Sequence, residues 1–283
     1  MVERTALYPQ HAARLIGIRK NIYTKIAELN CEAALSKEPI KKDKLNEAEF
    51  APYQTGMVWG SDFDCAWFKF KGQVPQKAKG KHVVALINIE GEGVVYIDGK
   101  AQQGITQVLT GIDIVQSRKG KQVVELFNPA EGGENVDILV DAGFNGKRHK
   151  ANTKVKLARK DIAICNDEIL TYYYDYLQLF MLMLTYGKNE YLKEERLKQI
   201  NKALSQSYKL YLKKDYLGAH NLLKEIICTP IDYDATEYTA IGHAHIDLAW
   251  LWPIRETKRK GARTYATALH NIEKNPNYVF GAS

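Results

Sequence analysis

The chain has 283 residues, of which 45% are hydrophobic and 26% are charged, and its formal net charge at pH 7 is +7. These values exclude a largely disordered chain, and the length exceeds what one hydrophobic core usually holds, so we expect several domains. The basic residues are dispersed, and their densest runs, at 41–44, 147–150 and 258–260, are interpreted as solvated surface. Because no nucleic-acid-binding motif accompanies them, we expect no nucleic-acid partner.

The sequence indicates a cytoplasmic protein without a membrane anchor. Its N-terminal residues carry charges where a secretory signal needs an apolar segment. The longest apolar stretch, Tyr176–Tyr186, is about half as long as a bilayer span requires. The cysteines, Cys31, Cys65, Cys165 and Cys228, are far apart and form no CxxC pair. This pattern is typical of separate, mostly buried thiols in a reducing compartment.

A helix is predicted over residues 11–29, where apolar side chains recur at helical spacing. Charged residues without a regular period follow as far as about Phe50. Beyond them, apolar side chains recur at every second position instead of at helical spacing. In "AWFKFK" the side chains of Ala66, Phe68 and Phe70 share one side and lysines occupy the other, as on a half-buried strand.

The alternating pattern continues through further short runs, at 82–90, 93–100, 121–128 and 135–143. Turns rather than helices separate these runs, which favours an antiparallel β-sandwich. Trp59, Trp67 and Phe68 lie within this region and could form a platform for stacking a sugar. We interpret them as core residues, because aromatic side chains in a sandwich are more often buried.

Helical periodicity returns after Asp161, and three helices are predicted, in the runs 167–184, 190–212 and 216–227. The segment "TPIDYDAT" that follows is interpreted as a linker. We therefore divide the chain into a helix-and-sandwich domain over 1–160, a helical segment with linker over 161–235, and a last domain over 236–283.

The last domain is predicted to contain a strand in "EYTAIGHAHID", a helix over 255–275 and a second strand in "NYVFGAS". A strand, a crossover helix and another strand form the repeating unit of a parallel sheet or barrel. The apolar stripe of the helix consists of Ala262, Tyr265, Ala266, Leu269 and Ile272. We expect a whole barrel to bury this stripe and a single strand–helix–strand unit to expose it.

His243, His245 and Asp247 occupy alternate positions at the end of the first of these strands. If the strand continues that far they share one face, at the carboxyl end where parallel α/β folds bind ligands. Imidazole and carboxylate groups bind zinc, and a catalytic zinc keeps one position open. Trp250 and Trp252 add flat apolar surface that suits a sugar ring. The residues alone leave two readings open, a metal-assisted hydrolase or a set of hydrogen-bonded residues at a strand end.

The stretch from about Tyr238 to Ser283 resembles the start of the catalytic domain of the family 38 α-mannosidases. The resemblance rests on HxHxD, AWLWP, the ET that follows, the ARxxATAL helix and the aromatic second strand. The sandwich and helices are similar, through weaker motifs, to the N-terminal region of the cytosolic and bacterial branch of that family. The resemblance implies a multidomain α+β protein: an N-terminal antiparallel β-sandwich with helices, then the first strand–helix–strand of a (β/α) barrel-like catalytic domain.

The resemblance also implies a zinc-dependent, retaining glycosidase that acts on mannose-containing oligosaccharides or glycans. By position, His245 and Asp247 match the first two zinc ligands, and Trp250 matches the aromatic residue near the bound mannose. His243 matches a histidine that supports the ligands. The nucleophile and the general acid/base are expected beyond Ser283, so the chain is expected to be the N-terminal part of a longer enzyme. Homo-oligomerisation is left open.

Two rival functions follow from the same residues. Amidohydrolase-like barrels also place an HxH pair at the end of their first strand, and there His243 and His245 would both bind metal. The AWLWP continuation and the large preceding region argue against this reading. The second rival is a non-catalytic protein in which the sandwich is a carbohydrate-binding or interaction module.

Overall fold

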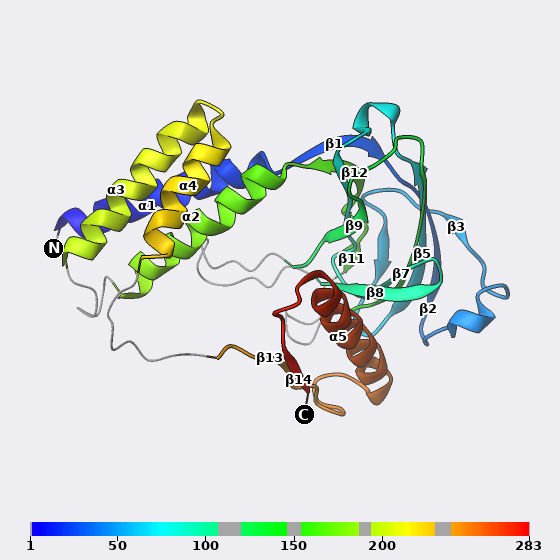
Figure 1. Cartoon of the computed structure of the whole chain (residues 1–283). Helices are drawn as coiled ribbons and strands as arrows, with labels where there is room; N and C mark the ends of the chain where they lie inside the picture. Colours follow the sequence, from blue (N-terminus) through cyan, green and yellow to red (C-terminus); the bar gives the residue numbers. More distant parts are fainter. Residues whose placement is uncertain (1, 107–119, 146–153, 187–193, 230–238, 283) are drawn as a thin grey trace. The chain divides into compact units, whose positions relative to one another are not determined.

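The structure, a computed structural model, describes residues 2–106, 120–145, 154–186, 194–229 and 239–282. The chain divides into two compact units (Figure 1). The helical unit consists of Met1–Thr24 and Cys165–Glu237, and the sandwich unit consists of Lys25–Ile164 and Tyr238–Ser283. Each unit is thus assembled from two separate stretches of sequence, and the proposed domain division at residues 160 and 235 stays a proposal.

The helical unit is built from α1 (Val2–Lys20), α2 (Asp167–Tyr186), α3 (Glu194–Leu212) and α4 (Tyr216–Ile227). The helices predicted over 167–184 and 216–227 are confirmed. The helix predicted over 190–212 is confirmed from Glu194 onward, and its first four residues lie outside the described residues.

Aromatic side chains fill the interior of the helical unit. The side chains of Tyr172 and Tyr176 are fully buried, and the ring of Tyr172 stacks on Tyr211 with 5.5 Å between centroids. The Tyr172 hydroxyl lies 3.1 Å from Ser207 Oγ, and the Tyr176 hydroxyl lies 2.6 Å from Nδ1 of the buried His11. Because their polar atoms have partners, these residues can be buried at little cost, and they pack the helices together.

The start of α4 gives a first testable prediction. Oδ1 of the N-cap residue Asp215 accepts a hydrogen bond of 2.9 Å from the backbone N–H of Gly218. We expect Asp215→Ala to lower the free energy of unfolding of the helical unit by about 1 kcal/mol, because one helix-end donor loses its partner. Urea titration followed by far-UV circular dichroism measures this loss. Asp215→Asn keeps the acceptor and serves as the control; an equal loss in both variants would show that the cap contributes nothing.

The helix predicted over residues 11–29 is wrong in its second half. α1 ends at Lys20, and residues Tyr23–Glu28 form strand β1. The chain turns at Asn21, whose N–H donates to Ile18 O at 3.0 Å. Half of the following segment, "YTKIAE", is aromatic or β-branched, and such side chains fit a pleated sheet better than a helix.

The sandwich contains a four-stranded sheet in the order β1-β12-β6-β9 and a six-stranded sheet in the order β3-β2-β5-β10-β7-β8, and β11 pairs with β4. Its strands after β1 are β2 (Asn30–Ser36), β3 (Ala51–Pro52), β4 (Val58–Gly60), β5 (Cys65–Gln73), β6 (His82–Asn88), β7 (Glu92–Ile97), β8 (Lys100–Ile105), β9 (Val123–Phe127), β10 (Asn135–Gly143), β11 (Val155–Lys156) and β12 (Arg159–Cys165). The antiparallel sandwich is confirmed: β10 pairs antiparallel with β5 on one side and with β7 on the other.

The core of the sandwich lies between these sheets. Ala66, Phe68 and Phe70 are fully buried, as their alternation predicts. The rings of Phe68 and Trp59 pack edge to face, with 5.7 Å between their centroids. Trp59 and Trp67 are each only 3% exposed, and their indole N–H groups donate to backbone carbonyls. These aromatic residues are therefore core residues, and they offer no platform for a sugar.

Strand β2 lies in the segment for which no regular structure was predicted. It pairs antiparallel with β5, so that Cys31 lies opposite Phe70 and Ala33 lies opposite Phe68. Cys31 and Ala33 are buried, but small side chains give little hydrophobic contrast in a sequence. The long-range pairing with β5, rather than local propensity, makes this segment a strand.

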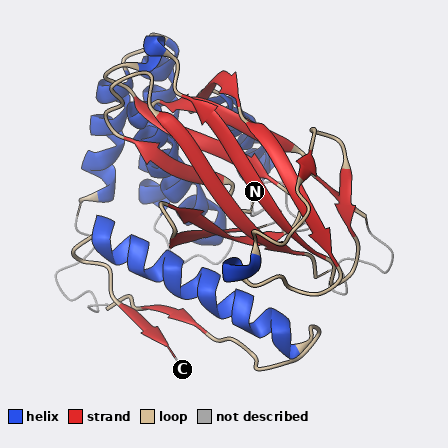
Figure 2. Cartoon of the chain, turned by 90° about the vertical axis from the view of Figure 1, so that its right-hand side faces the viewer, coloured by secondary structure: helices blue, strands red, loops and turns tan. Residues whose placement is uncertain are grey.

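The remainder of the sandwich unit is β13 (Gly242–Ala244), α5 (Ile254–Lys274) and β14 (Phe280–Ala282). β13 and β14 pair in parallel, with His243 opposite Gly281, which confirms the predicted strand–helix–strand unit. Figure 2 shows α5 lying between the sandwich and the β13–β14 pair. One side of α5 contacts β7 and β8.

Two expectations about the whole chain can be compared with the structure. The cysteines are free thiols, and Cys31, Cys65 and Cys165 are buried while Cys228 is exposed, as predicted. Within the described part of the chain, no helix combines the length and apolar content that crossing a membrane requires.

Candidate metal centre

The predicted metal-binding residues lie at the end of β13 and just beyond it. The strand ends at Ala244, so His243 is on the strand whereas His245 and Asp247 lie in the loop that follows. The alternation of a single strand therefore does not extend to Asp247. The loop nevertheless brings two of the side chains together, since Nε2 of His245 lies 3.2 Å from Oδ1 of Asp247.

This separation is that of a long hydrogen bond, and it is also close to the spacing of two ligand atoms on one metal ion. A charge-assisted N–H···O bond usually measures about 2.7–2.9 Å. Zinc bonds of about 2.0–2.1 Å in a tetrahedral arrangement place neighbouring ligand atoms about 3.3–3.4 Å apart. The two side chains are 70% and 40% exposed, which leaves room for further ligands and a substrate. His245 and Asp247 therefore fit zinc in both spacing and chemistry.

Trp250 and Trp252 form an edge-to-face pair beside these residues, with ring centroids 5.8 Å apart and an interplanar angle of 86°. Trp250 is 57% exposed. Thr257 on α5 connects Trp252 to the loop that carries His245 and Asp247. Its Oγ1 accepts the Trp252 indole N–H at 3.1 Å and faces the carbonyl oxygens of Leu248 and, at 3.3 Å, of Asp247. One hydroxyl therefore holds both the indole and the loop backbone.

The helix that follows this loop turns its charged side towards the sandwich. The buried residues of α5 are Glu256, Arg259, Lys260, Ala266 and Ala268. The interpretation of the run 258–260 as solvated surface is wrong for Arg259 and Lys260, because carboxylates of the sandwich pair with them.

The apolar stripe of α5 lies on the outer side, as expected for a single strand–helix–strand unit. Tyr265, Leu269 and Ile272 are 45%, 61% and 43% exposed, and Ala262 is also exposed. Ala266 is the exception, since it is buried. The helix thus presents an apolar surface to its surroundings and a charged surface to its own unit.

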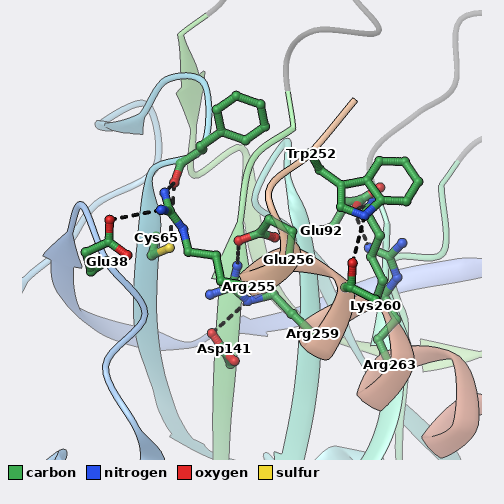
Figure 3. Close-up of polar contacts among 12 residues, drawn as sticks. Glu38, Cys65, Glu92, Asp141, Trp252, Arg255, Glu256, Arg259, Lys260 and Arg263 are labelled. Carbon is green, nitrogen blue, oxygen red and sulfur yellow. Dashed lines mark hydrogen bonds and ion pairs between the residues drawn. The ribbon is translucent and has the colours of Figure 1, made fainter. Parts of the chain in front are cut away.

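Arg259 lies between two carboxylates. Its Nε is 2.9 Å from Oδ1 of Asp141 on β10, and its Nη1 donates to Oε1 of Glu256 one turn earlier (Figure 3). The side chains of Arg259 and Glu256 are each only 3% exposed. Burial raises the pKa of Asp141 to about 6, although the neighbouring Arg259 acts in the opposite direction. This charged triad ties the first half of α5 to β10.

Glu92 at the start of β7 pairs with two cations of α5. Its Oε2 lies 2.7 Å from Nζ of Lys260 and 2.5 Å from Nη1 of Arg263. Burial alone would raise the pKa of Glu92, but Arg263 and Lys260 outweigh it and hold the pKa at about 2. Lys260 Nζ also lies 4.4 Å from the centroid of the Trp252 ring, which is a cation–π distance. Lys260 therefore contacts the sandwich and the aromatic pair at once.

Two glycines of the sheet give these cations their space. A Cβ atom on Gly104 would lie 2.6 Å from Cγ of Arg263, and one on Gly143 would overlap the guanidinium of Arg259. The N–H of Gly104 also donates to Thr267 Oγ1 at 2.9 Å. The missing side chains let a charged helix face approach the sheet closely.

Sequence reasoning missed this charged interface because its carboxylates and glycines are more than a hundred residues away from the helix in sequence. One local signal was present. Glu256, Arg259, Lys260 and Arg263 lie at positions i, i+3, i+4 and i+7, so they share one face of a helix, which indicates a common partner.

Two family profiles match the chain. The profile described as "Alpha-mannosidase, jelly roll domain" matches residues 25–164, and the profile "Glycosyl hydrolases family 38 N-terminal domain" matches residues 235–283. The chain belongs to the family 38 α-mannosidases. Within this family 38 chain, α5 of the second matched region packs on β7 and β8 of the first, so the two regions share the sandwich unit.

The chain is similar to several α-mannosidases. It is 27% identical to human "Alpha-mannosidase 2C1" over 88% of this chain and 24% of that protein. It is 25% identical to "Alpha-mannosidase G" of Dictyostelium discoideum over 94% of this chain and 25% of that protein. It is 24% identical to "Alpha-mannosidase" of Saccharomyces cerevisiae over 87% of this chain and 24% of that protein. The chain therefore spans about a quarter of the length of these relatives.

Among solved structures, two bacterial β-glucuronidases align with part of this family 38 chain. The enzyme of Faecalibacterium prausnitzii aligns with a TM-score of 0.33 and 11% identity over 52% of this chain and 32% of its own. The enzyme of Ruminococcus gnavus aligns with a TM-score of 0.33 and 12% identity over 50% of this chain and 29% of its own.

Proposed function

We propose that this chain carries part of the metal-binding and mannose-binding apparatus of a zinc-dependent, retaining α-mannosidase. Membership of family 38 supports the reaction class, the hydrolysis of α-mannosidic bonds in oligosaccharides or glycans. The observation that carries the metal assignment is the 3.2 Å separation of His245 Nε2 and Asp247 Oδ1, with both side chains accessible. His243 on β13 supports the loop rather than binding the metal.

Mannose gives each of these residues a role. Its axial 2-hydroxyl and equatorial 3-hydroxyl are neighbours, and a zinc ion held by His245 and Asp247 supplies a Lewis acid that both can reach. Asp247 offers a carboxylate oxygen, and His245 binds through Nε2 in its neutral form. The exposed ring of Trp250 stacks on the apolar face of the sugar. A retaining mechanism also needs two carboxylates, and the resemblance assigns neither to a residue of this chain.

The same proposal places the enzyme in the cytoplasm. Cys228 is an exposed free thiol, and such thiols persist in a reducing compartment.

Zinc binding by residues 1–283 tests the metal assignment directly. Two matched ligands are fewer than the three or four protein ligands of a typical zinc site, so we expect weak binding of one ion and no turnover of an aryl α-mannoside. His245→Ala and Asp247→Ala should each weaken the binding by more than about tenfold, since even an outer partner of a ligand contributes that much. Equilibrium dialysis with measurement of bound zinc gives these affinities.

His243→Ala separates the proposal from the amidohydrolase-like alternative. If His243 only supports the loop, this variant retains more affinity than either ligand variant. A loss equal to that of His245→Ala would instead identify an HxH metal pair. Normal zinc affinity in Asp247→Ala would contradict the proposed ligand set.

A further inference from the structure

We propose that Glu92 of the jelly roll region is a positioning residue for the mannose-binding loop, acting through Lys260 and Trp252. This inference rests on the proposed function of the loop. It extends that function by giving the sandwich a part in setting the geometry of the site.

The contacts form a continuous path from the sheet to the loop. Glu92 accepts a hydrogen bond of 2.7 Å from Lys260 Nζ, and that same Nζ lies over the Trp252 ring. The Trp252 indole N–H then donates to Thr257, whose hydroxyl donates to the carbonyl of Leu248 and lies 3.3 Å from that of Asp247. Each step joins two groups whose positions are already restricted. A shift of Glu92 therefore displaces the indole and the backbone of a proposed metal ligand.

Burial restricts the movement of the side chains that form this path. The side chains of Glu92 and Lys260 are 17% and 10% exposed, so neither can replace its partner by water without moving the helix. An unpaired buried cation is costly, which keeps Lys260 between the carboxylate and the indole. Trp252 in turn contacts Trp250 edge to face, so the path also reaches the residue proposed to stack on mannose.

The same carboxylate provides a matched control. Arg263 also pairs with Glu92, at 2.5 Å, but it leads to Gly104 on β8 rather than to Trp252. Lys260→Met breaks the path and leaves Glu92 with Arg263. Arg263→Met leaves the path intact and removes a comparable ion pair. Lys260→Arg keeps a cation that can bind Glu92 and cover the indole.

The experiment uses residues 1–283 labelled with 5-fluorotryptophan, with Trp250 and Trp252 resonances assigned from single Trp→Phe variants. In metal-free protein we expect Lys260→Met and Glu92→Gln to shift the Trp252 resonance and, through the contact of the two rings, the Trp250 resonance. We expect Arg263→Met to leave both resonances in place and Lys260→Arg to restore them. Titration with zinc should show an affinity about tenfold weaker in Lys260→Met, the lower end of what supporting contacts contribute.

The outcomes distinguish the inference from the proposed function. If Lys260→Met leaves both the Trp250 resonance and the zinc affinity unchanged, or if Arg263→Met alters them equally, Glu92 does not position the loop. If zinc moves neither tryptophan resonance in the unaltered protein, the metal site is wrong, and the metal-free spectra still decide whether the path exists. If Glu92→Gln fails to fold, the comparison of Lys260→Met with Lys260→Arg still tests the inference.

Discussion

Replacing His245 or Asp247 by alanine in an intact α-mannosidase that contains this chain is expected to lower kcat/KM by more than about a hundredfold. Contacts that merely orient a metal ligand contribute about tenfold to a hundredfold, so loss of a ligand itself must cost more. In the proposed site these side chains, 3.2 Å apart, bind one shared ion, so neither can replace the other. Steady-state kinetics on an aryl α-mannoside, together with zinc content, measures the effect.

Trp250→Ala is the comparison for this prediction. Its ring is 57% exposed and is proposed to contact the sugar rather than the metal, so zinc content should remain normal while KM rises. An Asp247→Ala enzyme with full zinc content and normal turnover would overturn the ligand assignment.

The second large effect is expected on stability. Arg259→Met should lower the free energy of unfolding of the sandwich unit by about 3–5 kcal/mol, because it leaves the carboxylates of Asp141 and Glu256 without their cation. Every tryptophan of the chain lies in the sandwich unit: Trp59, Trp67, Trp250 and Trp252. Urea unfolding followed by tryptophan fluorescence therefore reports on this unit alone.

Two variants control for the loss of a positive charge. Lys258→Met removes a charge from an exposed position of the same helix and should change stability by less than about 0.5 kcal/mol. A triple variant, Asp141→Asn with Glu256→Gln and Arg259→Met, removes all three charges and should recover most of the loss, since no charge is left unpaired. If Arg259→Met is no worse than Lys258→Met, the triad does not hold α5 in place.

The sequence was most informative where periodicity is strong and local. The alternation around Phe68 and the apolar spacing of the helices at 167–184 and 216–227 correctly predicted their elements, because each pattern follows from which face is buried. The same reasoning failed at Tyr23–Glu28, where Ile22, Ile26 and Leu29 continue a helical spacing and only pairing within the sheet makes the segment a strand. Strand β2 was missed because its buried residues are small.

The site shows the same contrast. The spacing of His245 and Asp247 in the sequence indicated metal chemistry, and the structure places the two side chains in contact. The charged contacts between α5 and the sandwich could not be predicted in this way. The sequence alone suggested that Lys260 is solvated. In the structure its Nζ lies 2.7 Å from Oε2 of Glu92, which is on a strand far away in the sequence. Local patterns reveal candidate metal-binding residues more readily than they reveal contacts with distant strands.

The division of the helical unit into two stretches of sequence affects how the protein is made. α1 contacts α2, and His11 of α1 is buried against Tyr176, yet the whole sandwich segment 25–164 is synthesised between them. At about 5–20 residues per second, α1 leaves the ribosome on the order of ten seconds before its partner helix exists. During that interval the apolar side of α1 is uncovered, and the sandwich is completed only when β12, directly before α2, has been synthesised. Chaperones that bind nascent chains are therefore expected to bind α1 before α2 has been synthesised.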